Sequence, residues 1–130
     1  MHLTLEMLDA LSARAKMSER LRVNFNLHEN VKDPVQRLLN AMEPGTIVPV
    51  HRHLQTAETI VLLRGKLKVV FYDDEKKATD SFLLEENSNS FGIHIPKGIW
   101  HGVEILKSGT VIFEVKEGPY EPLRESDVLS

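Results

Sequence analysis

Two hydrophobic periods divide the chain into a short helical part and a long part made of β-strands. Apolar residues recur every three or four positions near the N-terminus, at Leu5, Leu8, Leu11 and Ala15. This spacing predicts an amphipathic helix over about residues 4–17. From about residue 20 the period shortens to two, which predicts a strand with one apolar face and one polar face, the polar face including Asn26 and His28.

Further short strands, separated by glycine and proline turns, are predicted as far as about residue 118. They are expected at 35–42, at 47–53, and in the segments "TIVLL", "KLKVVFY", "SFLL", "FGIHIP" and "TVIFEV". The two strands that flank Arg64-Gly65 are predicted to form a hairpin. One helix followed by about eight short strands predicts an all-β antiparallel sandwich or barrel, because the connections are too short for crossover helices. With a turn-rich tail over 119–130, the whole chain is expected to form one domain.

Composition narrows the class of protein. The chain has 130 residues, of which 42% are hydrophobic, with a net charge of -3 and no cysteine. One hydrophobic core is therefore expected, without disulfides or thiolate metal ligands. No basic cluster suggests a nucleic-acid partner. No apolar stretch is long enough to span a bilayer and the N-terminus lacks the apolar core of a signal peptide, so a cytoplasmic protein without a membrane partner is expected.

Histidines and a glutamate form a candidate metal site. On a strand, His51 and His53 would face the same way and could converge on one ion. Glu58 lies at an odd offset from them, so it can join only if the chain turns a corner over residues 54–57. His101 follows a Pro/Gly turn in "PKGIWH" and could complete the site from a neighbouring strand. Taken singly, each motif is more often a solvated strand face or an ordinary turn than a metal site.

Taken together, these residues resemble the two sequence motifs of the cupin family. The first motif runs from Gly45 through "TIVPV", His51-Arg52-His53, "LQTA" and Glu58 to Gly65 and matches at every fixed position. The second matches at Pro96, Gly98 and His101, with Ser90 in place of its first glycine and Ile105 in place of its final asparagine. The resemblance implies a cupin-type antiparallel jelly-roll β-barrel with a short N-terminal α-helix. It also implies one divalent metal ion per chain, held by His51, His53, Glu58 and His101.

Over a longer range, from about residue 20 to 122, the sequence resembles the WbuC family of cupin-fold metalloproteins. The likeness is carried by "RVNFNLHE", "DPVQRLLNAMEPGT", "HRH", "IWH" and "FEVKEGPYEP". It implies a link to bacterial surface-polysaccharide (O-antigen) metabolism, in a family whose reaction is not established. Because cupins tend to pair through barrel edges, a homodimer is also expected.

Three functions are compatible with this site. The first is a metal-dependent, isomerase- or epimerase-like enzyme acting on a sugar or nucleotide-sugar, with the metal as Lewis acid and Glu58 or a nearby histidine moving the proton. The alternatives are a non-catalytic, metal-dependent sugar-binding module and an Fe(II)-dependent oxygenase. Zinc, iron, manganese and nickel all accept imidazole and carboxylate ligands, so the identity of the metal stays open.

Five further residues are candidates for substrate contacts or for supporting the metal ligands. They are Asn26, His28, Arg37, His94 and Tyr120. Each also has a plainer interpretation, such as an exposed strand face, a surface ion pair or a packed aromatic ring. Lys116 is expected to face solvent.

Overall fold

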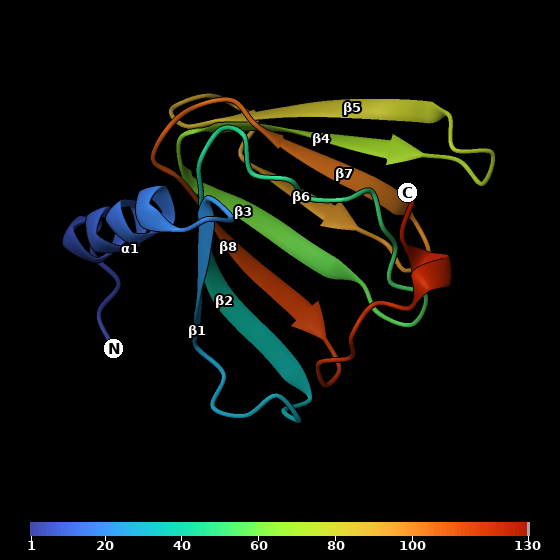
Figure 1. Ribbon diagram of the computed structural model, residues 1–130, viewed down its shortest axis with the longest axis horizontal. Coiled ribbons are helices and arrows are strands. Elements are labelled where there is room, and N and C mark those ends of the chain that lie inside the picture. Colours follow the sequence, from blue (N-terminus) through green and yellow to red (C-terminus); the bar gives the residue numbers. More distant parts are fainter. Residues whose placement is uncertain (130) are drawn as a thin grey trace.

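Two antiparallel sheets and one α-helix make up the described part of the chain, residues 1–129 of this computed structural model. The elements are α1 (Leu5–Met17), β1 (Arg22–Asn26), β2 (Val35–Met42), β3 (Glu58–Arg64), β4 (Lys66–Tyr72), β5 (Ala78–Glu85), β6 (Gly92–Ile95), β7 (Trp100–Ile105), β8 (Thr110–Glu117) and the 3-10 turn η1 (Glu125–Asp127). The larger sheet has the order β1-β2-β8-β3-β6 and the smaller one β5-β4-β7. Figure 1 shows β4, β5 and β7 above the larger sheet. The predicted all-β jelly roll with a short N-terminal helix is confirmed, with the two sheets packed as a sandwich rather than joined into one closed barrel.

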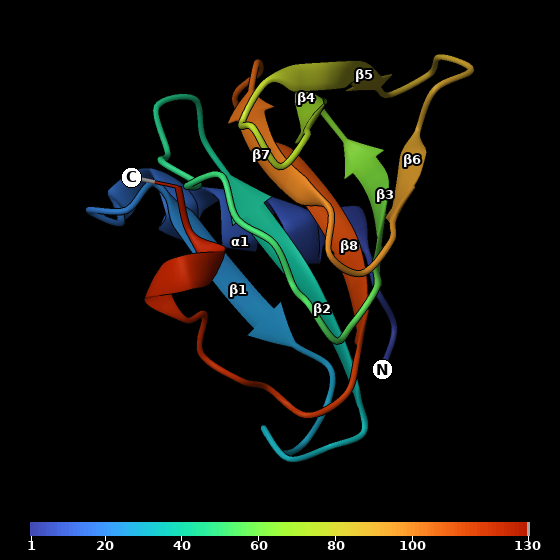
Figure 2. The ribbon, with the colours of Figure 1, turned by 90° about the vertical axis from the view of Figure 1, so that its right-hand side faces the viewer.

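Helix α1 covers the outer face of the larger sheet. Thr4 caps the helix by accepting a hydrogen bond from the Met7 amide at 3.3 Å. The apolar stripe of the helix packs against outward-facing residues of β2 and β8, in a cluster made by Leu8, Leu11, Ala15, Leu39, Ala41 and Val111. Figures 1 and 2 show α1 beside these strands, on the side away from the smaller sheet.

The inner face of the larger sheet changes from apolar to polar along its strands. Asn40 lies opposite Ile112, and Leu38 opposite Glu114, so these side chains share one face of the sheet. At one end of this face, Met42, Ile60, Leu62 and Ile112 pack against Leu67, Val69, Leu84 and Ile105 of the smaller sheet. At the other end the same face carries Glu58, Glu114 and Lys116. The core therefore fills one end of the sandwich and leaves polar side chains at the other.

The predicted hairpin around Arg64-Gly65 is wrong. β3 pairs with β6 and β8, whereas β4 pairs with β5 and β7, so the chain crosses from one sheet to the other at Gly65. Gly65 has a φ of 96°, and a Cβ there would lie 2.2 Å from Thr110 Oγ1. The glycine is needed for a tight crossing against β8 and not for a hairpin turn.

The predicted strand over 47–53 is reduced to isolated bridges at His51, which pairs with His101 and Val128. Pro49 cannot donate a backbone hydrogen bond, which helps to explain why regular pairing does not extend further back along this segment. The C-terminal segment lies against the same stretch, because the Leu129 amide donates to Val50 O at 2.8 Å. Figure 2 shows this segment in red beside the connection between β2 and β3. Among residues 1–129, no helix combines the length and the apolar character needed to cross a membrane.

Candidate metal centre

His51 and His101 face each other across an antiparallel bridge. The His51 amide donates to His101 O at 3.0 Å, and the His101 amide donates to His51 O at 2.8 Å. Residues directly opposite each other in such a pair project to the same side. The two imidazole centroids are consequently only 4.3 Å apart.

Each of these two rings is oriented by a backbone carbonyl two residues earlier in the chain. His51 Nδ1 lies 2.8 Å from Pro49 O, and His101 Nδ1 lies 2.9 Å from Ile99 O. Since a carbonyl oxygen can only accept, each Nδ1 carries the proton. In the neutral ring this leaves the Nε2 lone pair free to bind a cation, which is the usual arrangement of metal-bound histidine.

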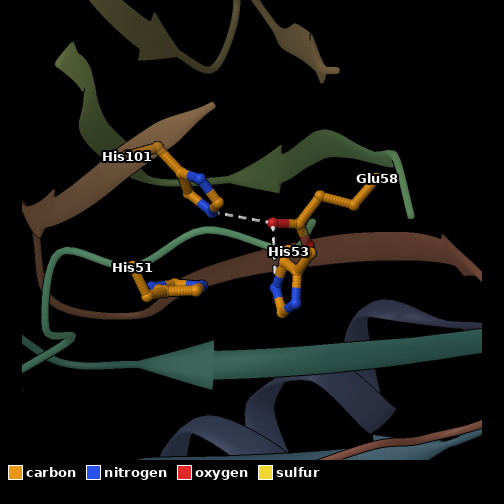
Figure 3. Close-up of side chains that lie close together, drawn as sticks. All are labelled: His51, His53, Glu58 and His101. Atoms are coloured by element: carbon orange, nitrogen blue, oxygen red, sulfur yellow. Dashed lines mark ion pairs between the residues drawn. The ribbon is translucent and has the colours of Figure 1, made fainter. Parts of the chain in front are cut away.

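His53 and Glu58 complete the cluster from the next stretch of chain. The backbone bends at Leu54 and Gln55, so that Glu58, at the start of β3, turns back toward the histidines. Glu58 Oε1 lies 2.9 Å from His101 Nε2 and 3.9 Å from His53 Nε2. Figure 3 shows the four side chains pointing toward one another. Three imidazoles thus meet one carboxylate.

The donor set fits a divalent metal ion. One ligand atom from each of His51, His53, Glu58 and His101 lies within 4.8 Å of the others. Ligand atoms around one ion with bonds of about 2.0–2.2 Å stand roughly 3–4 Å apart, so only a small contraction is needed. His101 Nε2 and Glu58 Oε1 face each other at 2.9 Å, and two such acceptors need a proton or a cation between them. The group can therefore hold a metal ion.

Burial holds two of the histidines in their neutral form. It lowers the pKa of His53 to about 4, outweighing the opposite effect of the Glu58 charge. The pKa of His51 is also lowered, first by burial and then by neighbouring His101. Burial would raise the pKa of Glu58, but the hydrogen bond and charge of His101 more than offset this and the net pKa is lowered. Neutral imidazoles and an ionised carboxylate are the forms that bind metals.

The cluster forms part of the wall of a cavity of about 300 Å3. Polar side chains line this cavity beside the cluster, namely Arg22, Asn40, Glu114, Lys116, Tyr120 and Glu121. Burial, followed by the nearby charge of Glu58, raises the pKa of Glu114 to about 7, against the opposing effect of a hydrogen bond with Asn40. The cavity therefore combines a possible metal position with both cationic and acidic groups.

Of the five supporting candidates from the sequence, the structure brings only Tyr120 to the wall of this cavity. His28 lies at the open end of the β1–β2 pair, where its Nδ1 is 3.1 Å from Arg37 O. Asn26 and Arg37 are exposed on strands of the larger sheet. His94 is exposed on β6 and pairs with Thr59 Oγ1 at 2.9 Å. The strand pairing places Arg37 and His94 on the outer face of the larger sheet. Asn26 shares the inner face with Leu38 but is exposed on the edge strand β1, and His28 follows the end of that strand.

Sequence reasoning missed several residues of the cavity wall, above all Glu114, Asn40 and Arg22. It also expected Lys116 to face solvent, whereas Lys116 lines the cavity. A signal for Glu114 was present, because a glutamate inside the apolar run "TVIFEV" shares one face of β8 with Ile112. What the sequence could not supply was the partner strand that brings this face to the histidines.

Solved structures share this fold. The chain resembles the capsular polysaccharide assembling protein CapF from Staphylococcus aureus, with 19% identity, 81% of this chain covered and a TM-score of 0.67. The match spans only 30% of CapF. The Cnp3 cupin domain of Schizosaccharomyces pombe matches at 12% identity over 77% of this chain and 66% of that one, with a TM-score of 0.61.

KdgF from Halomonas sp. matches at 11% identity over 77% of this chain and 82% of its own, with a TM-score of 0.60. At these identities the likeness establishes the fold, which is that of the cupins, and nothing further. No curated protein sequence matches the chain. One family model does match, over residues 3–84, which is more than half of the chain. The chain therefore belongs to the family described as Domain of unknown function (DUF6016).

Proposed function

We propose that this protein is a metal-dependent enzyme that performs isomerase-like chemistry on a small polar molecule, of the sugar or nucleotide-sugar type. The observation that carries the proposal is the meeting of three imidazoles and one carboxylate at the wall of a cavity of about 300 Å3. Structural metal sites are usually closed by protein ligands on all sides, whereas catalytic ones keep a side open to a ligand cavity.

A divalent ion in this centre would polarise a substrate carbonyl and make the neighbouring C–H more acidic. The protein's part is to position that chemistry. The carbonyl groups of Pro49 and Ile99 fix the rings of His51 and His101, so little reorganisation is needed on binding. Glu58 either completes the donor set or accepts and returns the proton, since its carboxylate is held ionised beside the histidines.

Two likenesses support a sugar-type substrate. The sequence resembles the WbuC family, which is associated with surface-polysaccharide metabolism, and the fold resembles that of a capsular polysaccharide assembling protein. With this substrate we propose a role in polysaccharide metabolism in the cytoplasm, as a homodimer. A non-catalytic sugar-binding module and an Fe(II)-dependent oxygenase are the alternatives that the experiments below separate.

The first experiment is elemental analysis of the purified protein beside two histidine variants. We expect about one divalent metal ion per chain in the wild type and in His94→Ala, whose imidazole lies outside the cluster. His51→Ala is expected to lose most of the metal, because one of four ligands is missing. Equal metal content in all three proteins, or no metal after reloading, would refute the proposal, because the proposed chemistry requires a metal ion bound by this cluster.

The second experiment tests catalysis by incubating the metal-loaded protein with a panel of sugars and nucleotide-sugars in D2O. Enolisation next to a carbonyl exchanges the C–H proton with solvent, so NMR should show deuterium at that carbon and, with turnover, an isomer. Thermal stabilisation by a sugar without deuterium uptake would indicate a binding module instead. Oxygen consumption by the iron-loaded protein, abolished by zinc, would indicate an oxygenase.

A further inference from the structure

Glu114 occupies an unusual position on the inner face of the larger sheet. It lies opposite Leu38 on β2 and opposite Ile60 on β3, both buried, and Ile112 precedes it on the same face. Glu114 is half-buried, and its carboxyl group is reached from the cavity that it lines. A carboxylate among aliphatic neighbours destabilises the fold unless partners compensate. Such a residue needs an explanation beyond packing.

Asn40 is the partner that β2 supplies, and it is only half satisfied. Its side-chain amide lies near the Glu114 carboxyl group and, as a hydrogen-bond donor, opposes the rise in the pKa of that group. Asn40 Oδ1 is buried, and no group in the described residues donates to it. Because the terminal torsion of asparagine is broad, a modest rotation of the amide can present this oxygen to a ligand. The pair therefore offers acceptor positions that the described chain leaves unfilled.

The pair shares its cavity with the metal centre. Asn40 and Glu114 line the same space of about 300 Å3 as His51, His53, Glu58 and His101. This volume is at the lower end of ordinary ligand cavities, so a ligand that reaches the metal position also meets this wall. Buried polar atoms are usually hydrogen-bonded. Asn40, unlike the similarly unpartnered Gln36, stands on the wall of the cavity, from which a ligand can supply the missing donor.

Cationic groups stand on the same wall. Arg22 of β1 and Lys116 of β8 line the cavity, and Lys116 Nζ lies 5.9 Å from the centroid of the Tyr120 ring. A divalent ion at the histidine cluster would add further positive charge, against the acidic side chains of Glu58, Glu114 and Glu121. The cavity therefore suits a ligand that carries both hydroxyl groups and negative charge.

We infer that Asn40 and Glu114 form a hydroxyl-binding subsite beside the metal centre, and that the cavity takes a small polyhydroxylated anion. The ligand's hydroxyl groups donate hydrogen bonds to Asn40 Oδ1 and to the Glu114 carboxyl group, while its anionic group lies toward the metal cluster and the cationic side chains. This inference rests on the proposed metal-dependent function and names the class of molecule that it acts on. It also makes the pair a determinant of specificity, since a ligand without hydroxyl groups leaves Asn40 Oδ1 unpaired.

The test compares two six-carbon carboxylates, gluconate and hexanoate, which differ only in their hydroxyl groups. Isothermal titration of the protein, loaded with the metal that it retains on purification, should show gluconate binding at least about tenfold more tightly than hexanoate. Asn40→Leu and Glu114→Met keep the side-chain size and remove the polar atoms. Each should reduce the preference by about three- to tenfold, through weaker gluconate binding.

Two further variants serve as controls. Gln36→Met removes a second side-chain amide on the same face of β2, whose buried nitrogen has no partner among residues 1–129. Gln36 does not line the cavity, so the preference should persist. Glu114→Gln keeps a hydrogen-bonding group and should retain part of the preference, which separates recognition from misfolding.

The outcomes separate the subsite from the proposed function. Metal content is measured for every variant, and an unchanged content with reduced preference supports the inference. A metal-loaded wild type that shows no gluconate binding, or binds gluconate and hexanoate equally, overturns the subsite but not the metal centre. An unchanged preference in both Asn40→Leu and Glu114→Met overturns it as well. A protein that holds no metal overturns the proposed function itself.

Discussion

The carbonyl groups that orient His51 and His101 occupy the same relative position, two residues before each histidine. Pro49 O and Ile99 O receive the Nδ1 protons at 2.8 and 2.9 Å. Ring orientation at both positions is therefore set within three consecutive residues and needs no distant contact. Glu58, by contrast, depends on a long-range contact, because it begins β3 of the larger sheet whereas His101, which its carboxylate meets, belongs to β7 of the smaller sheet.

Metal-free protein is expected to lose stability as the pH falls from about 6.5 to 4. In this interval the unfolded chain protonates His53 at its ordinary pKa of 6.5, whereas in the folded chain burial holds that pKa at about 4. The unfolded state then binds more protons, so acidification favours unfolding, by at most about 3 kcal/mol for this residue. Denaturant titrations of chelator-treated protein at several pH values measure the slope.

His53→Gln is the control for this slope, because glutamine does not titrate. Its free energy of unfolding should fall less steeply over the same pH interval than that of the wild type. Parallel pH profiles for the two proteins would show that His53 is not held neutral by burial.

Residue patterns in the sequence predicted the four clustered side chains of the candidate metal centre better than the residues that line the cavity beside it. Fixed spacings brought His51, His53, Glu58 and His101 to attention, and in the structure the four side chains meet. That they bind a metal stays a prediction until it is measured. Asn40 was missed because nothing local marks it, since its role depends on β2 lying beside β8. Period-two alternation shows which residues share a face, but not which strands lie together.

At the scale of the elements, the crossing from β3 to β4 decides the topology. The dipeptide Arg64-Gly65 correctly indicated a break between strands, but a hairpin and a crossing to another sheet both place a glycine at such a break. The backbone at Gly65 passes so close to Thr110 that a Cβ would lie 2.6 Å from Thr110 Cα. Long-range contact with β8 therefore selects the crossing, and the local sequence does not contain this information.

Gly65→Ala is expected to destabilise the fold by at least about 3 kcal/mol, because the added methyl group overlaps the Thr110 backbone and the φ of 96° is unfavourable for alanine. Gly98→Ala is the matched control. Gly98 also has a positive φ, of 81°, but no atom lies within 4 Å of the added Cβ, so a cost of only about 1–2 kcal/mol is expected. Thermal or urea unfolding compares the two, and equal losses would contradict the close approach at Gly65.

At the scale of the whole molecule, the two sheets contribute differently to the candidate metal centre. His101 belongs to β7 of the smaller sheet, and His51 is bridged to it, whereas Glu58 begins β3 of the larger sheet. Core packing holds the layers together at one end of the sandwich, and the polar cluster lies at the other. An ion bound here would join the layers where apolar contacts do not.

Metal addition is therefore expected to raise the melting temperature of chelator-treated protein. At a free metal concentration one thousand times the dissociation constant, the stabilisation is about 4 kcal/mol, or on the order of ten degrees for a domain of this size. His101→Ala should show little of this shift, while His94→Ala should keep it. A similar shift in both variants would mean that metal acts elsewhere on the protein.

The division of ligands between the two layers also has a consequence for kinetics. With an ion shared between Glu58 of the larger sheet and His101 of the smaller one, the layers cannot separate at this end without breaking a coordination bond. Release of the ion and opening of the sandwich then become one event, with a common activation barrier. Slow exchange of the ion would thus be accompanied by slow hydrogen exchange of the amides that lie between the layers.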